Sequence, residues 1–400
     1  MVTLALIVFW ASVLLMFHSY VLYPLLLQLF SAGKKENELV FKVNDTHLPQ
    51  VYVVMAVYNE ERVLHEKLAS LFNTSYPLNR LKVYIGSDNS ADNTNSIVEE
   101  FAAKYPQLVF RPFTSRNGKA QIVNKLVDEI FDTGFPSALG SGVFIFTDAN
   151  VMFTQETIFE MVKHFRNENI GQVAANILNK DIQKDGISLQ EKSYIQRENQ
   201  VKYLEGLNWG SMIGAFGACY AMRINHWIDI PLNYLMEDFF LSMHVLRKGK
   251  NAIMELKAVC YEDVSNDIEE ELKRKTRIQA GNFQNLAVYW PLLFRFNAVA
   301  FCFFSHKVIR WLGPVFIVLS YMANICLLNS GQFYVFTFVV QNLLLLSPLF
   351  DWLFKRMGLH LILLRFASYF YVMNFALVKG FMMYVKGVKT SAWSPTKRNV

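Results

Sequence analysis

The sequence predicts an α/β domain with a doubly wound, mostly parallel sheet, placed between membrane-spanning helices at both ends of the chain. Three observations predict it. Residues 1–31 are apolar and uncharged, residues 49–285 alternate short apolar strands with amphipathic helices, and residues 286–400 return to long apolar runs. Strand–helix alternation is typical of a parallel sheet, and about 20 apolar residues cross a bilayer. We therefore expect three regions: a first span, a sheet domain and a second membrane region.

Composition excludes several classes of protein. Hydrophobic residues make up 53% of the 400 residues and charged residues 18%, against about 25% charged in soluble domains. This argues against a disordered, collagen-like, coiled-coil or purely soluble chain. The net charge of +6 is uneven, because residues 286–400 hold 11 Lys and Arg but one acidic residue. A basic surplus within an apolar region indicates contact with anionic membrane lipids, and we expect no nucleic-acid partner.

The membrane regions set the expected topology. Residues 1–31 lack the basic start and cleavage site of a signal peptide, and Lys34–Lys35 follow at once. The amino terminus is then outside and the domain cytoplasmic, in a multi-pass protein of the inner (plasma) membrane. Later candidate spans cover residues 311–328, 333–354 and 359–385. Residues 287–304 contain Arg295 and are expected to form an interface helix. The number of carboxyl-terminal spans, three or four, stays undecided. Three spans would place the basic tail outside, against the positive-inside rule.

The middle region predicts an ordered series of strands and helices. The expected strands cover Val51–Val57, residues 81–87, Leu108–Phe113 and Val143–Thr147, and the expected helices cover Glu61–Phe72 and residues 92–105, 120–131 and 268–285. The four cysteines form no CxxC pair, so we expect them to be reduced packing residues. Ligands in such sheets bind beyond the carboxyl ends of the strands. Polar residues at those ends are therefore the candidate site.

Two polar stretches follow the first two strands. Ala56, Tyr58 and Glu60 lie in Ala-Val-Tyr-Asn-Glu. A small residue, an aromatic ring and polar groups there can hold a flat nucleobase, and the alternative is a strand-end turn with a helix cap from Asn59. Asp88 closes the second strand and has no expected capping duty. We expect its carboxylate to be free to accept a hydrogen bond from a uracil or ribose group.

Two further turns suit anions and cations. Arg-Asn-Gly-Lys ends at Lys119 and opens a helix, where free N–H groups and the helix dipole favour a phosphate. Asp148 and Asn150 follow the fourth strand two residues apart, so they can point to the same side. Such oxygens can hold Mg²⁺ or Mn²⁺ together with a diphosphate. A solvated loop and a polar strand-end turn are the alternatives.

The last two groups lie on helices. Glu237 and Asp238 open one helix, either as partners of its dipole or as a general base for an acceptor hydroxyl. The helix dipole would lower the pKa of such a base, whereas burial and the acidic neighbour would raise it. Arg274 and Arg277 share a helix face and suit a diphosphate. The alternative for them is a surface helix paired with the preceding glutamates.

In this order, the six elements resemble the membrane-bound family 2 glycosyltransferases of the GT-A fold, the group of cellulose, hyaluronan and poly-N-acetylglucosamine synthases. The resemblance covers nearly the whole chain. It implies that residues 56–60 form the nucleoside-binding opening, that Asp88 contacts the uridine part, and that Lys119 belongs to the R-x-G-K turn near the nucleotide. It implies a nucleotide-sugar donor, a glycan or lipid-linked acceptor and membrane lipids as partners.

The resemblance also assigns the remaining positions. Asp148 and Asn150 match the DxD motif, whose first aspartate helps to hold the metal and the sugar diphosphate. Glu237 and Asp238 match the ED motif, whose aspartate is the catalytic base. Residues 274–278 match the QxxRW region, in which Arg277 touches the diphosphate.

Two departures from the family pattern qualify these roles. Asn150 replaces the second DxD aspartate, and Arg274 and Ile278 replace the glutamine and tryptophan of QxxRW. Isoleucine cannot stack on an acceptor sugar as tryptophan does, which weakens the case for processive synthesis. We expect an inverting transfer from a nucleotide-sugar, with a UDP-sugar as the first expectation, in cell-envelope or exopolysaccharide synthesis. The alternatives are a non-catalytic transferase-like subunit and a transporter.

Overall fold

The computed structural model describes residues 1–133, 142–180, 188–263, 268–359 and 361–392, and it divides into two compact units. The sheet unit contains residues 30–184, 191–266 and 388–400. The helical unit contains residues 1–29, 185–190 and 267–387. The boundary near residue 267 lies on the amino-terminal side of the expected one at 285, because the helix that begins at Ile268 groups with the apolar helices.

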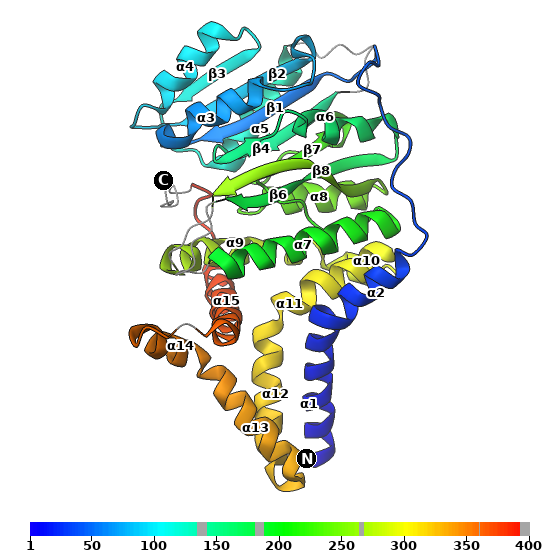
Figure 1. Cartoon of the computed structure of the whole chain (residues 1–400), viewed down its shortest axis with the longest axis vertical. Coiled ribbons are helices and arrows are strands. Elements are labelled where there is room, and N and C mark those ends of the chain that lie inside the picture. Colours follow the sequence, from blue (N-terminus) through cyan, green and yellow to red (C-terminus); the bar gives the residue numbers. More distant parts are fainter. Residues whose placement is uncertain (134–141, 181–187, 264–267, 360, 393–400) are drawn as a thin grey trace. The chain divides into compact units, whose positions relative to one another are not determined.

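One eight-stranded sheet forms the centre of the sheet unit (Figure 1). Its spatial order is β3-β2-β1-β4-β7-β6-β8-β5. The strands are β1 (Val51–Val57), β2 (Leu81–Asp88), β3 (Leu108–Phe113), β4 (Val143–Thr147), β5 (Val151–Phe153), β6 (Ile170–Lys180), β7 (Cys219–Arg223) and β8 (Asn251–Asp263). The expected strands of the first half are confirmed.

The sheet is mixed rather than mostly parallel. Strands β1 to β4 are parallel, but β7 runs antiparallel to both β4 and β6, and β5 runs antiparallel to β8. The expected parallel order therefore holds for β1 to β4 and for the β6–β8 pair, but not for the pairings of β7 and β5. Alternating polarity identifies a strand, whereas its direction depends on pairing with strands far away in the sequence.

Helices pack on the sheet, several of them through regular apolar stripes. In the sheet unit these helices are α3 (Glu61–Phe72), α4 (Thr94–Lys104), α5 (Lys119–Asp132), α6 (Thr157–Val162), α7 (Ser188–Trp209) and α8 (Glu237–Arg247), with short turns η2 (Leu78–Arg80), η4 (Lys163–Arg166) and η5 (Ile224–His226). All seven residues of β1 are buried. Each fully buried Val or Leu contributes about 1.5–3 kcal/mol. This packing fixes the strand ends, and with them the polar turns.

The helical unit begins with one continuous apolar helix and continues after the sheet unit. Its elements are α1 (Val2–Phe17), η1 (His18–Leu22), α2 (Tyr23–Phe30), α9 (Ile268–Tyr289), η6 (Trp290–Phe294), α10 (Ala298–Cys302), η7 (Phe303–Val308), α11 (Ile309–Trp311), α12 (Gly313–Leu327), η8 (Leu328–Ser330), α13 (Gln332–Leu345), α14 (Ser347–Arg356) and α15 (Ile362–Val385). α1 packs along α12 through Ala5, Phe9, Ala323 and Leu327.

Three helices in the described part of the chain are long and apolar enough to cross a membrane: Val2–Phe30, Gly313–Ser330 and Ile362–Val385. The expected span over residues 333–354 is instead a pair of helices bent by 50° between Leu345 and Ser347. A proline in the first turn of α14 explains the break, since it cannot continue the preceding helix. The bent pair is either one broken span or a re-entrant segment.

The single interface helix expected over residues 287–304 is wrong. α9 continues to Tyr289, a 3₁₀ turn follows over Trp290–Phe294, and α10 begins after Asn297. Pro291 stands in the first turn of η6, and the Asn297 side chain accepts a hydrogen bond from the Ala300 backbone N–H. Proline and an N-cap residue therefore divide the stretch. Trp290, Phe294 and Phe296 remain exposed.

Candidate active site

Asp88 lies at the end of β2 and organises the turn before α5. Its carboxylate is fully buried and accepts hydrogen bonds from the backbone N–H groups of Asn117 (2.6 Å) and Gly118 (3.0 Å). Arg116 Nε lies 3.2 Å from the same carboxylate. The expectation that Asp88 is free is therefore wrong, because the Arg-Asn-Gly turn occupies both oxygens. A carboxylate has further lone pairs, so an additional donor can still bind.

The stretch after β1 faces the same turn. Ala56 is buried within the strand, and the Arg116 guanidinium lies 3.2 Å from the centre of the Tyr58 ring. Glu60 is buried, and its backbone N–H donates to the Thr94 hydroxyl at 2.8 Å. Tyr58, Arg116 and Asp88 therefore form a stack of ring, guanidinium and carboxylate at adjacent strand ends. The structure brings together the residues expected to face a nucleoside.

A lysine links the two expected acidic motifs. Lys119 is the first residue of α5, and its Nζ lies 2.7 Å from Asp148 Oδ1 and 2.6 Å from Glu237 Oε1. Burial lowers the pKa of Lys119, but the two carboxylates outweigh it and hold that pKa above its ordinary value. In the sequence these residues lie in three separate motifs. The fold joins them into one cluster.

Asp238 lies beside this cluster, in the first turn of α8. Its side chain is buried, and Oδ1 accepts a hydrogen bond from the Phe239 N–H at 2.7 Å. Burial, followed by the neighbouring Glu237, raises the pKa of Asp238 to about 7, against the opposing influence of Lys119. Burial and the acidic neighbour therefore outweigh the groups that lower this pKa, which are Lys119, the Phe239 N–H and Lys202. A carboxylate with this pKa can gain and lose a proton near neutral pH.

Asp148 and Asn150 have different partners. Asp148 remains about one-third exposed and pairs with Lys119, whereas Asn150 Nδ2 lies 3.1 Å from Glu262 Oε1 on β8. Among the residues that the structure describes, no group of three or more His, Cys, Asp or Glu side chains could hold a metal ion. One carboxylate fits a hard cation only if other oxygens complete its shell, as substrate phosphates do for Mg²⁺. The site fits a metal held jointly with a diphosphate.

Arg274 and Arg277 belong to the helical unit, whereas the cluster just described belongs to the sheet unit. Both lie on α9, where Arg274 makes two hydrogen bonds to Glu271, at 3.0 Å and 2.9 Å. The Glu271 carboxylate is buried, yet Arg274 and Lys275 together lower its pKa to about 2. Arg274 therefore takes part in the ion-paired helix that was the alternative reading.

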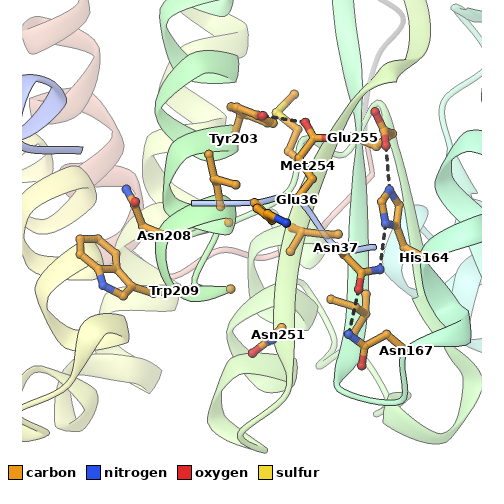
Figure 2. Close-up of a pocket in the computed structure, with 16 residues that line it drawn as sticks. Glu36, Asn37, His164, Asn167, Tyr203, Asn208, Trp209, Asn251, Met254 and Glu255 are labelled. Atoms are coloured by element: carbon orange, nitrogen blue, oxygen red, sulfur yellow. Dashed lines mark hydrogen bonds and ion pairs between the residues drawn. The ribbon is translucent and has the colours of Figure 1, made fainter. Parts of the chain in front are cut away.

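A polar cavity lies away from these turns. It has a volume of about 230 Å³ and lies beside the beginning of β6 and β8, whereas the acidic cluster follows the end of β4. Figure 2 shows several of its polar side chains paired with one another. Tyr203 donates to Glu36 at 2.7 Å, and His164 Nε2 lies 2.7 Å from Glu255. Asn37 Nδ2 lies 3.1 Å from His164 Nδ1. These contacts attach the segment after the first apolar helix to the sheet.

Sequence reasoning missed two residues that shape the cluster. Lys67 is fully buried on α3 and bonds to the turn that carries Asp148. Its signal was a lysine within the buried stripe of α3, where three of the four neighbours at helical spacing, Val63, Leu64 and Leu71, are apolar. Gly217 lies against Asp238, and a β-carbon there would lie 3.0 Å from Asp238 Oδ2. Nothing in the local sequence separates this glycine from an ordinary loop residue.

Comparison with known proteins identifies a family for part of the chain. Residues 52–224 match the family Glycosyl transferase family 2. The probable glycosyltransferase YdaM of Bacillus subtilis is 24% identical over 256 residues, which cover 60% of this chain and 57% of that protein. The beta-monoglucosyldiacylglycerol synthase of Synechocystis is 27% identical over 251 residues, 60% of this chain and 50% of the synthase. The chain thus aligns with about half the length of these relatives.

Two further similarities extend over more of the chain. The poly-beta-1,6-N-acetyl-D-glucosamine synthase of Staphylococcus epidermidis is 23% identical over 292 residues, 71% of this chain and 67% of that synthase. The structure of the mannosyltransferase PcManGT from Pyrobaculum calidifontis, in complex with GDP-Man and Mn²⁺, superposes with a TM-score of 0.65. It covers 94% of this chain and 99% of PcManGT at 16% identity. At that identity the likeness establishes the fold, and the sheet unit has the expected GT-A architecture.

Proposed function

From the family 2 glycosyltransferase domain that this chain carries, we propose that it transfers a sugar from a nucleotide-sugar to a membrane-associated lipid-linked or glycan acceptor, with inversion. The observation that supports this most strongly is Asp238, a buried carboxyl with a pKa of about 7 beside the Lys119 cluster. Three of the six motif regions meet there, although they lie far apart in the sequence.

Asp238 is the proposed general base. Its carboxylate takes the proton of the acceptor hydroxyl while that oxygen attacks the anomeric carbon and the bond to the diphosphate breaks. The proton ends on Asp238 and the electron pair on the leaving nucleoside diphosphate. Attack from the face opposite the leaving group inverts the anomeric configuration. A general base of this kind contributes about 10²–10⁴-fold to a rate when its pKa lies near the operating pH.

The diphosphate end of the donor is assigned to Asp148, Asn150 and Lys119. Asp148, with Asn150 beside it, would hold a divalent ion, either Mg²⁺ or Mn²⁺. When bound, that ion neutralises charge that develops on the departing diphosphate. Lys119 supplies a fixed positive charge at the same place. Arg277, with Arg274 as its neighbour, is kept as a further proposed contact to the diphosphate.

The nucleoside end is assigned to the stack of Tyr58, Arg116 and Asp88. An aromatic ring and a guanidinium plane suit a base, and Asp88 can accept a hydrogen bond from a base or ribose group. Ala56 leaves room at the strand end, and Glu60 holds the following turn through its backbone. Because both the ring and the buried carboxylate are bound to Arg116, donor binding would order all three together.

The most direct test measures release of nucleoside diphosphate by detergent-purified protein. A panel of UDP- and GDP-sugars is supplied with Mg²⁺ or Mn²⁺ and a lipid extract, and Asp238→Asn serves as the control. Release with one donor that disappears in the variant supports the proposal and names the donor. The size of the labelled product then separates single transfer from polymerisation.

A non-catalytic subunit is the second candidate, and Asn150 favours it because an amide is a weaker metal ligand than a carboxylate. That candidate predicts nucleotide binding without release for every donor in the panel. If a folded Asp238→Asn protein still releases nucleoside diphosphate, Asp238 is not the base, but the proposal that the protein is an enzyme stands.

We also propose a topology for the chain as an inner-membrane protein. Residues 388–392 belong to the sheet unit, where a β-carbon at Gly118 would overlap the Ser391 hydroxyl and lie 2.9 Å from the Ala392 nitrogen. The chain therefore leaves the sheet unit at residue 267 and returns to it at residue 388. The number of complete crossings between these points is even. With Lys34–Lys35 marking the cytoplasmic side, the basic tail is cytoplasmic, in agreement with the positive-inside rule.

Cysteine labelling in intact cells tests this topology. In a Cys326→Ser background, Lys389→Cys should stay protected from a membrane-impermeant maleimide until the cells are opened. Gly331→Cys, which lies between α12 and α13, should react from outside. Labelling of residue 389 from outside would show an odd number of crossings and would reject the proposal.

A further inference from the structure

A lysine occupies a core position of α3. The buried residues of this helix repeat at helical spacing, and Lys67 is fully buried among Val63, Leu64, Leu68 and Leu71. Burial of an ammonium group costs free energy unless fixed partners compensate it. A leucine or methionine there would pack equally well. The partners of Lys67 therefore indicate what it does.

Both hydrogen bonds of Lys67 reach the turn that carries Asp148. Nζ donates to the Thr147 hydroxyl at 2.9 Å and to the Val151 carbonyl oxygen at 2.5 Å. It also lies 3.7 Å from the centre of the Phe153 ring. Thr147 ends β4 and Val151 begins β5. One ammonium group thus fixes the residues on both sides of Asp148-Ala149-Asn150.

The same network continues toward the base. The Thr147 hydroxyl donates to the Ala218 carbonyl oxygen at 3.0 Å, and the Asp148 backbone N–H donates to that oxygen at 3.2 Å. Ala218 follows Gly217, the residue that lies against Asp238. The chain of contacts from Lys67 therefore includes the backbone of Asp148 and the loop beside Asp238.

We propose that Lys67 is a positioning residue that holds the Thr147–Val151 turn, so that Asp148 presents its carboxylate to a divalent cation and a nucleoside diphosphate. This rests on the proposed function of Asp148. It assigns to a core lysine the task of orienting a ligand that it does not touch. Groups that orient metal ligands typically change metal affinity by about 10–100-fold when they are removed.

The charge of Lys67 persists at neutral pH. Burial lowers its pKa to about 8, and Cys219, Cys260 and Asp148 oppose that decrease. The group therefore donates its hydrogen bonds as an ammonium ion under ordinary conditions. Methionine has a similar length and no donor, so Lys67→Met removes both bonds and keeps most of the packing volume.

The test measures binding rather than turnover. Mn²⁺ binding in the presence of UDP or GDP, followed by the free-ion electron paramagnetic resonance signal, should weaken at least about 10-fold in Lys67→Met. Thr147→Val deletes the acceptor hydroxyl and should weaken binding in the same direction, which keeps the test valid if the lysine variant folds poorly. Leu68→Ala is the matched control, because it removes a fully buried side chain of the same helix that cannot form a hydrogen bond.

The outcomes separate the two proposals. Leu68→Ala should lower Tm by as much as Lys67→Met, or more, and leave Mn²⁺–nucleotide affinity unchanged. If Lys67→Met and Thr147→Val lower Tm but bind Mn²⁺ and nucleotide like the wild type, Lys67 is structural only and the inference is wrong. If the wild type itself binds no Mn²⁺–nucleotide, the proposed role of Asp148 fails, and the inference that rests on it fails too.

Discussion

Asp88 and Asp238 are buried aspartates at the edges of one sheet unit, and their surroundings differ in charge. Asp88 is matched by the Arg116 guanidinium and two backbone N–H groups. Asp238 has one backbone N–H, an acidic neighbour in Glu237, and Lys119, which itself contacts Asp148 and Glu237. The donors around Asp88 balance the negative charge of its carboxylate. Asp238 belongs to a cluster of three carboxyl groups and one ammonium group.

This difference shows how one residue type serves two purposes. A carboxylate surrounded by donors fixes the backbone around it, and removing it damages a turn. A buried carboxyl beside another acid has its pKa raised to about 7, so removing it changes proton transfer. The two positions therefore predict opposite effects on stability when aspartate is replaced by asparagine.

Asp238→Asn should have the largest effect on activity. Loss of the base should reduce transfer by about 10³-fold while nucleotide binding remains. The pKa of Asp238 in the folded protein lies above its unfolded value of about 4, so stability falls as pH rises from about 4 to 7. Above pH 7 the folded protein keeps the full cost of the buried charge. Asparagine carries no such cost. Tm should therefore rise in the variant at pH 8 and change little at pH 4, measured by differential scanning fluorimetry.

Replacement of Lys119 by glutamine should reduce turnover by about 10²-fold and shift its pH dependence. In the wild type the rate should rise with pH through about 7, as Asp238 loses its proton. Lys119 lowers the pKa of Asp238, so its removal should move this rise to higher pH. A pH–rate profile measures the shift, and Lys104→Gln, on the surface of α4, controls for loss of a positive charge. An unchanged pH–rate profile would show that Lys119 does not influence the pKa of Asp238.

Asp88→Asn should destabilise the fold, in contrast to Asp238→Asn. It weakens two hydrogen bonds to a charged acceptor and removes the ion pair with Arg116, at a cost of about 2–4 kcal/mol. Donor affinity should fall about 10-fold because the turn before α5 loosens. Urea unfolding and nucleotide titration measure the two effects. Asp92→Asn is the control, since its half-buried carboxylate also bonds two backbone N–H groups but lies outside the turn. A stabilised Asp88→Asn protein would contradict the comparison.

Replacing the two arginines of α9 should give the smallest changes. The two variants should differ, because one mainly affects stability and the other mainly affects donor binding. Arg274→Ala leaves the buried Glu271 without its bidentate partner, so stability should fall by about 1–3 kcal/mol and the pKa of Glu271 should rise. Arg277→Ala should weaken donor binding and turnover with less effect on Tm. If donor binding is unchanged in Arg277→Ala, the proposed contact to the diphosphate is wrong.

The local elements of the sheet unit were predictable from the sequence. β1, β3, β4 and α3 have the expected bounds, because short apolar runs and helical spacing are local properties of the sequence. The antiparallel β7 was not predicted, since its direction depends on pairing with β4 and β6. The interface helix failed for another reason, because Pro291 and Asn297 divide an otherwise apolar run.

The candidate site divides in the same way. The sequence alone determined which residue types follow each strand, and hence that acidic and basic groups gather at one edge of a sheet. Tertiary structure decided their partners: Asp88 binds the turn before α5, Lys119 joins Asp148 to Glu237, and Lys67 supports the metal turn from inside the core. The physical reason is that spacing along a chain fixes which face a side chain occupies, whereas charge pairing and burial depend on contacts between residues that are distant in sequence.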